Sequence, residues 1–218
     1  MKIQKNIVRA AAAAGLQIAC IVALAFAAPS AFAQAWPNRT ITLVVPFAAG
    51  GGTDAIARVL AEKLAARLGQ PVVVENKAGA ASAIGTAYVA KAPADGYTLL
   101  MTTNSALVIL PLIQPAGTLN YDRADFSLIG LTGILPNILI VSPKVPAQST
   151  AELIAYAKSN PGQLSFASSG NGTITHLIGE LFKARTGIDV VHVPYRTGVQ
   201  ATPDVMEGRI HYLFDNII

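Results

Sequence analysis

Two glycine-rich segments combine residue types that suit an anion-binding loop. The first, 46–54, follows an apolar run, precedes a helical pattern, and offers as candidate ligands Phe47, Gly51, Gly52, Thr53 and Asp54. Glycine lets the backbone turn sharply and lets a ligand approach closely. A helix start leaves unpaired N–H groups and a partial positive charge, which suit a carboxylate. The alternative is a plain β–α turn in which Thr53 or Asp54 caps the helix.

The second segment, 168–173, repeats the order of strand, glycines, hydroxyl side chains and helix start. Its candidate ligands are Ser168, Ser169, Asn171 and Thr173, with His176 just inside the following helix. Serine, threonine and asparagine supply neutral donors that orient a carboxylate or a hydroxyl. A capped turn beside a solvated histidine is the alternative here.

Polar or aromatic residues also follow several predicted strands. They are Phe47, Asn104, Ser168, Tyr195 and Asp215. In open α/β sheets, ligands bind at the carboxyl ends of the strands. The repetition of such residues at equivalent positions therefore predicts one shared binding site.

Other chemistries have weaker support. Ser168 and His176 suggest a hydrolase, but no G-x-S-x-G elbow surrounds the serine and no acid is indicated behind the histidine. His192 and His211 lack metal-binding spacing, and neither glycine segment matches a nucleotide-binding fingerprint. We expect a binding protein rather than an enzyme, with no metal and no cofactor.

The periodicity predicts an α/β fold of parallel or mixed sheets flanked by helices. The first half reads strand, helix, strand, helix, strand, at 40–46, 56–68, 71–75, 84–92 and 97–102. In the second half, strands are predicted at 126–131, 137–142, 164–167, 190–193 and 211–215. Helices are predicted there at 149–159, 174–186 and 202–207, the first of them capped by Ser149 and Glu152.

The N-terminus resembles an export signal. Lys2, Lys5 and Arg9 precede an apolar stretch at 10–28, and Ala33 ends a small-x-small cleavage site. An uncleaved membrane anchor, or a lipid attached to the single cysteine, Cys20, is the alternative. Since the signal carries three charges of a formal net charge of +4, no basic surface for nucleic acid is expected. We predict a periplasmic protein whose mature part follows a signal peptide at 1–33.

Long blocks of the sequence resemble the Bug family, the periplasmic solute-binding proteins of tripartite tricarboxylate transporters. The blocks are VPFAAGGGTDAIARVLAEKLAARLGQPVVVENKAGA, DGYTLLM, SSGNGTITHLIGELFKARTGIDVVHVPYR and FDN. The resemblance implies a bilobal type II periplasmic-binding-protein fold, with lobe 1 at 34–133 and lobe 2 at 134–218. It also implies a monomer that captures a small carboxylate (a di- or tricarboxylate, acidic amino acid or aromatic acid) for a membrane permease. Asp215 matches a family aspartate near the distal part of the ligand.

The sequence departs from the family pattern in three places. Ala48 and Ala49 stand where Pro-Pro is frequent, and Arg196 stands where lysine is frequent. Family members are also roughly half as long again, which predicts a fold that is incomplete at the C-terminus. Such a chain is expected to expose apolar sheet edge and to aggregate, and an inactive gene fragment is an alternative to a working receptor.

Overall fold

The computed structural model describes residues 36–216. The strands and helices described here all lie in one compact unit, Arg39–Ile218. The predicted signal peptide at 1–33 lies outside the described residues and stays a prediction. Within 36–216, no helix has both the length and the apolar character needed to cross a bilayer.

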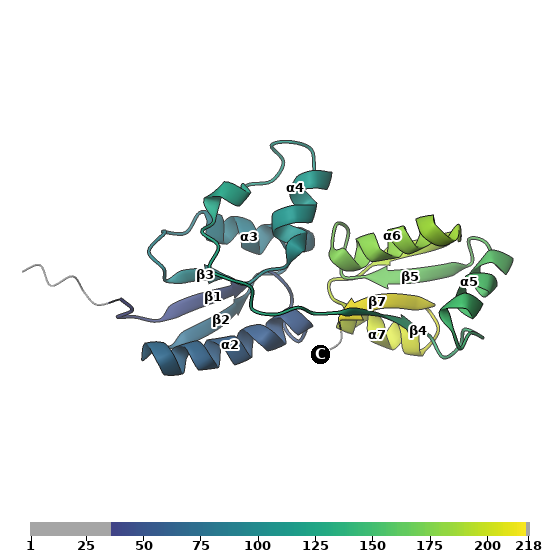
Figure 1. Ribbon diagram of the computed structural model, residues 1–218, viewed down its shortest axis with the longest axis horizontal. Helices are drawn as coiled ribbons and strands as arrows, with labels where there is room; N and C mark the ends of the chain where they lie inside the picture. The colour runs from purple at the N-terminus through teal and green to yellow at the C-terminus, as the bar shows by residue number, and fades with distance from the viewer. Residues whose placement is uncertain (1–35, 217–218) are drawn as a thin grey trace, which may run out of the picture. The chain divides into compact units, whose positions relative to one another are not determined.

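The first sheet contains three parallel strands in the order β2-β1-β3. They are β1 (Ile41–Val45), β2 (Val72–Asn76) and β3 (Thr98–Leu100), connected through α2 (Gly52–Leu68) and α3 (Ala83–Ala90). Strand β2 lies on one side of β1, and the next connection passes over β1 so that β3 lies on its other side. Right-handed crossovers therefore place α2 and α3 on opposite faces of the sheet (Figure 1). All three strands end at the same edge.

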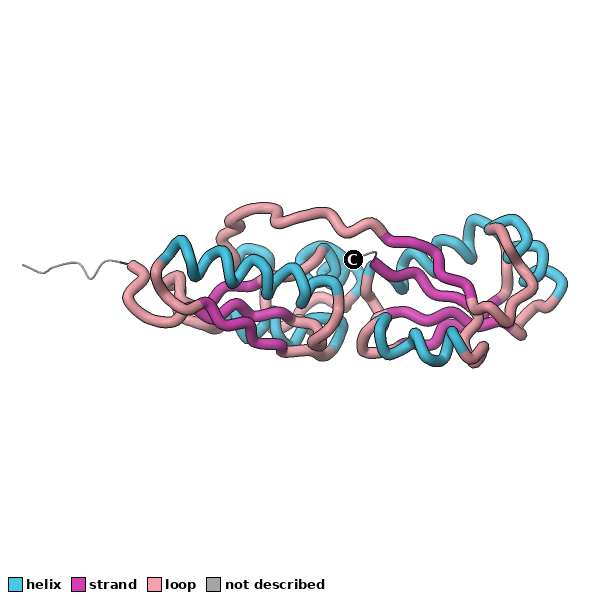
Figure 2. Tube along the Cα trace, turned by 90° about the horizontal axis from the view of Figure 1, so that it is seen from below, coloured by secondary structure: helices cyan, strands magenta, loops and turns pink. Residues whose placement is uncertain are grey.

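The second sheet contains four strands in the order β4-β7-β5-β6, and only β4 is antiparallel. The strands are β4 (Asn137–Val141), β5 (Leu164–Ser168), β6 (Val190–Pro194) and β7 (Tyr212–Asn216). The helices are α5 (Thr150–Ser159), α6 (Ile174–Thr186) and α7 (Gly198–Met206). Figure 2 shows this alternation of strands and helices along the trace. The predicted α/β class, with two parallel or mixed sheets flanked by helices, is confirmed.

Most predicted elements are present, with shifted ends. The segment 126–131, predicted as a strand, is irregular and follows a short 3₁₀ helix, η3 (Arg123–Asp125); that prediction is wrong, because no described strand pairs with it. A π-helical turn, η2 (Ser105–Ile109), and α4 (Leu110–Ile113) were not predicted. Helix α7 begins well before the predicted 202, because Thr197 caps it and Pro203 lies inside it. A 3₁₀ turn, η1 (Ala80–Ser82), places three consecutive non-glycine residues at positive φ.

The core of the second sheet is built around aromatic rings. Phe166 and Tyr212 are fully buried, and their rings stack at 5.6 Å between centroids. Gly179 in α6 lies directly against the Phe166 ring. A Cβ at that position would stand 2.0 Å from the Phe166 ring, so the helix approaches the sheet only because the residue has no side chain.

We expect Gly179→Ala to destabilise the fold. Alanine is favoured over glycine inside a helix by about 1 kcal/mol, but overpacking a core costs about 1–3 kcal/mol, so the clash with Phe166 should win. Chemical denaturation measures the difference. Gly133→Ala is the control, since a Cβ there meets nothing within 4 Å. An unchanged or higher midpoint for Gly179→Ala would contradict the packing described here.

The irregular segment 128–134 exposes large apolar side chains. Leu128 is 67% exposed, Ile129 86%, Leu131 82% and Ile134 82%. Isolated surface hydrophobic residues are ordinary, but several within one extended stretch form a contact-prone surface.

We therefore expect the chain to self-associate through 128–134. The double substitution of Ile129→Lys with Leu131→Lys should shift the molecular mass toward the monomer in size-exclusion chromatography with light scattering. Val59→Lys, at an exposed position on α2, is the control and should leave the mass distribution unchanged. A wild-type chain that stays monomeric at every concentration would disprove this expectation.

Candidate functional site

A cleft lies where the carboxyl ends of strands from both sheets meet. It has an empty volume of about 630 Å³, including the part open to solvent. Its walls come from the segments that follow β1, β3, β5 and β6 and from the end of β7. This is where ligands are expected in open α/β sheets.

The first wall is the start of α2. Gly51 is the N-cap, with extended backbone and no side chain to bond the first N–H groups of the helix. Gly52 and Thr53 follow as the first two helical residues, and both line the cleft. The positive end of α2 therefore faces the cleft uncapped by any side chain. The alternative prediction, a cap supplied by Thr53 or Asp54, is wrong because the helix begins before both residues.

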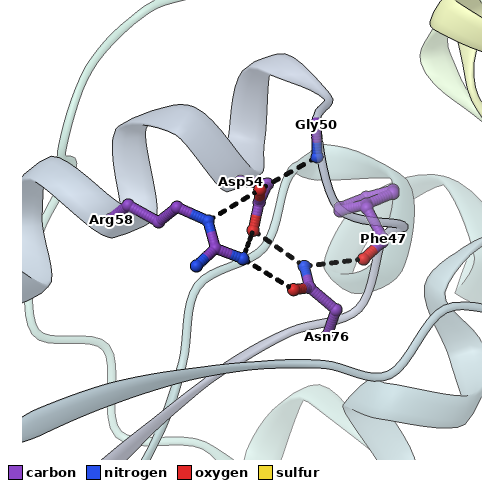
Figure 3. A network of polar contacts seen from close by, with 5 residues as sticks. All are labelled: Phe47, Gly50, Asp54, Arg58 and Asn76. Carbon is purple, nitrogen blue, oxygen red and sulfur yellow. Dashed lines mark hydrogen bonds and ion pairs between the residues drawn. The ribbon is translucent and has the colours of Figure 1, made fainter.

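Asp54 instead holds the loop that precedes α2 (Figure 3). Its carboxylate accepts the Gly50 N–H at 2.9 Å, the Asn76 Nδ2 amide at 2.9 Å and the Arg58 guanidinium at 3.0 and 3.1 Å. Asn76 also donates to the Phe47 carbonyl at 3.1 Å. Burial raises the pKa of Asp54, but hydrogen bonds from Arg58, Gly50 and Asn76 outweigh burial, so the pKa lies below its ordinary value.

The second wall is the start of α6. Thr173 is the N-cap: its Oγ1 accepts the His176 N–H at 3.4 Å and donates to the Gly170 carbonyl at 2.7 Å. The next N–H, of Ile174, donates to Ser105 Oγ at 3.2 Å. Since Ser105 follows β3, this bond joins the two sides of the cleft directly.

The third wall is the start of α7, beside the end of β7. Thr197 caps the helix by accepting the Gln200 N–H at 3.3 Å. An ideal Cβ on Gly198 would lie 1.8 Å from Asp215 Oδ2, so glycine is needed for the carboxylate to fit here. Burial raises the pKa of Asp215. Arg196, an exposed cation that forms none of the ion pairs found among residues 36–216, also lines the cleft.

The cleft gathers about half of the residues predicted from sequence. Those that line it are Phe47, Gly51, Gly52, Thr53, Ser169, Thr173 and Asp215. Those that do not are Asp54, Asn104, Ser168, Asn171, His176 and Tyr195. Ligand contact by any of them stays a prediction.

The residues outside the cleft have structural partners or lie exposed. Ser168 is 2% exposed, and its hydroxyl lies 2.7 Å from His192 Nε2. The Tyr195 hydroxyl donates a short hydrogen bond to Asp204. Burial and, to a smaller extent, this bond raise the pKa of Tyr195 to about 12. Asn104 and Asn171 are exposed.

Sequence reasoning missed part of the cleft. The additional lining includes Thr103, Ser105, Thr175, Thr197 and Gly198. Thr197 and Gly198 could have been found as a threonine N-cap followed by glycine, whereas Ser105 carried no signal. The residues described also include no cluster of three or more histidine, cysteine, aspartate or glutamate side chains that would hold a metal.

The fold and the cleft define a protein of the periplasmic-binding-protein class. The model of the tripartite tricarboxylate transporter family receptors matches residues 56–217, and the chain belongs to this family. A curated relative, protein BugT of Bordetella pertussis, is 40% identical over 200 residues, which are 92% of this chain and 61% of BugT. The resemblance to the Bug family is thereby confirmed, and the family consists of binding proteins rather than enzymes.

Solved structures give the same relationship. The chain is similar to Rpa4515 of R. palustris with adipate (38% identity, TM-score 0.72, 83% of this chain and 60% of that one). It is also similar to MatC of Rhodopseudomonas palustris with bound malate (31% identity, TM-score 0.76, 83% of this chain and 61% of that one). A third similar structure is the periplasmic binding protein BugD (34% identity, TM-score 0.74, 83% of this chain and 60% of that one). The chain spans about three fifths of the length of these relatives.

The Asp54 network gives a prediction about stability. We expect Asp54→Asn to lower the free energy of unfolding by about 1–3 kcal/mol, because the guanidinium and amide donors around it lose a charged acceptor. Because the folded pKa is depressed, the stabilisation is present above 3.8, the ordinary value, and is lost as the pH falls through the folded pKa.

Urea denaturation at pH 7 and at decreasing pH measures this contribution. The gap between wild type and Asp54→Asn should close in acid. Glu62→Gln, on the exposed side of the same helix, is the control and should change little. Equal stability of wild type and Asp54→Asn at pH 7 would rule out the role given to this carboxylate.

Proposed function

We propose that the chain is an extracytoplasmic receptor that binds a small carboxylate in the cleft and presents it to the permease of a tripartite transporter. The observation that carries this proposal is the arrangement of three helix starts, at Gly52, Ile174 and Gly198, around one cleft. Each contributes backbone N–H groups and a partial positive charge, and α2 has no side-chain cap to satisfy them. A carboxylate supplies the missing acceptors.

The relatives support the chemical class of the ligand. One was solved with adipate and another with malate, both of them small dicarboxylates. In this chain, the cleft adds one cation, Arg196, and one acid, Asp215. A ligand that has hydroxyl or amino groups besides its carboxylates would find both an acceptor and donors there. Periplasmic location is proposed on the same basis, since BugD is a periplasmic protein.

The geometry does not favour the hydrolase alternative. Ser168 lies beside His192 rather than His176, and its hydroxyl is buried while accepting the Gly170 N–H at 3.1 Å. Among residues 36–216, no carboxylate is hydrogen-bonded to His192 to orient it as a base. A buried hydroxyl that makes two hydrogen bonds has a structural role rather than that of a nucleophile. This interpretation agrees with membership of a family of binding proteins.

Isothermal titration of the full chain against malate, adipate, citrate, glutamate and nicotinate tests the proposal. We expect heat with at least one of these acids and none with the corresponding amides or esters, because only the carboxylates match the charge of the helix starts. No binding by any acid, or turnover of an ester, would reject the receptor.

A charge placed at the start of α2 provides a sharper test. We expect Thr53→Glu to weaken carboxylate affinity at least tenfold, because its carboxylate repels the ligand and competes for the same N–H groups. Thr53→Gln, which has the same size and no charge, is the matched control and should weaken affinity much less. Equal affinities for the two variants would show that the ligand does not use the start of α2.

A further inference from the structure

A column of four aromatic rings leads from the core of the second sheet to the loop 168–173. His176 stacks on His192 at 4.2 Å, His192 on Phe166 at 4.8 Å, and Phe166 on Tyr212 at 5.6 Å between ring centroids. The interplanar angles are 27°, 29° and 16°, so the rings are close to parallel. Phe166 and Tyr212 are fully buried, which makes the lower half of the column rigid.

The upper two rings hold the loop through hydrogen bonds. His192 Nε2 lies 2.7 Å from Ser168 Oγ, which also accepts the Gly170 N–H at 3.1 Å. His176 Nδ1 accepts the Gly172 N–H at 3.2 Å. Gly170 and Gly172 have φ of +117° and +83°, conformations that glycine adopts readily and other residues do not. The Gly172 amide is therefore held by His176 directly, and the Gly170 amide is held by Ser168, which contacts His192.

The bond from Gly172 requires an unprotonated nitrogen on His176. An N–H donor such as that of Gly172 can bond Nδ1 only while Nδ1 carries no proton. The Ser168 hydroxyl has one proton and two lone pairs, so besides accepting from Gly170 it can bond His192 Nε2 as donor or as acceptor. Charging both rings would also place two cations face to face at 4.2 Å.

The surroundings of His192 favour its neutral form. Burial first, and then the neighbouring His176, lower the pKa of His192 to about 4; Lys183 lowers it further and Glu180 opposes the shift. An ordinary histidine titrates near 6.5, so the unfolded chain takes up this proton before the folded chain does. The neutral ring therefore contributes stability fully above pH 6.5, and this contribution is lost as the pH falls from 6.5 toward 4.

We propose that His176 and His192 are positioning residues that, as a stacked neutral pair, hold the loop 168–173 in the shape that presents α6 to the ligand. Neither histidine lines the cleft, so the pair acts through Ser168, Gly170 and Gly172. Loss of the bonds from the pair releases the loop and weakens carboxylate binding. The effect on affinity rests on the proposed function, whereas the effect on the loop does not.

The test uses the full chain and three variants. His192→Gln keeps a polar atom near the Nε2 position but cannot take a proton, whereas His192→Phe keeps the stack and loses the bond to Ser168. The control, His211→Gln, changes a histidine of the same sheet whose pKa burial also lowers. Its Nδ1 accepts the Ser165 N–H at 3.0 Å, three residues before Ser168 along β5 and away from the loop.

Amide hydrogen exchange of Gly170 and Gly172, followed by NMR, reports the loop without any ligand. At pH 7.5, His192→Phe should exchange about tenfold faster at Gly170, the size expected for one lost buried hydrogen bond. His192→Gln and His211→Gln should keep wild-type exchange there. Unchanged exchange in His192→Phe would overturn the proposal.

Titration with adipate and malate at pH 7.5 then measures affinity. At pH 7.5, His192→Phe should bind about tenfold more weakly and His192→Gln within about twofold of wild type. Equal affinities of His192→Phe and wild type would overturn the effect of the histidine on binding. If wild type binds no acid, the receptor function fails and the exchange data still decide the role of the histidines.

Discussion

The unpaired backbone N–H groups at the starts of helices are the constraint on which the site depends. A helix start cannot satisfy its own first donors, and burying donors without acceptors is costly. Parallel strands bring three such starts to one cleft, and the chain satisfies them differently: Thr173 and Thr197 cap two helices, whereas Gly51 leaves α2 without a side-chain cap. A bound anion is the natural acceptor for the donors that remain.

Several segments of this fold pack closely because a glycine lies at the point of contact. Gly179 lets α6 settle on Phe166, and Gly198 lets the Asp215 carboxylate lie against α7. A Cβ at Gly85 would stand within 3 Å of Pro46 and the Lys77 carbonyl, so α3 packs against the loop after β1 in the same way. The position of the cleft walls therefore depends on glycines that themselves touch no ligand.

Local signals predicted the elements well because the causes are local. The Ser149 cap and the helix ends at Gly69 and Gly187, both left-handed, are where the sequence places them. The wrong predictions concern residues whose conformation depends on contacts with residues far away in the sequence. Asp54 turns toward Asn76, 22 residues on, and Ser168 pairs with His192, 24 residues on, and no spacing rule indicates either contact. The apolar alternation at 126–131 predicts a strand, but a strand also needs a neighbour to pair with.

The bond from Ile174 N–H to Ser105 Oγ means that one donor of α6 is engaged before any solute arrives. Gly172 also packs against Leu110 and Ile113 of α4; a Cβ there would come within 2.9 and 3.0 Å of them. The two walls thus contact each other in the absence of a ligand, which lowers the conformational entropy that they lose when a ligand binds. For the proposed receptor, such preorganisation would lower the free energy that binding spends on ordering the walls of the cleft.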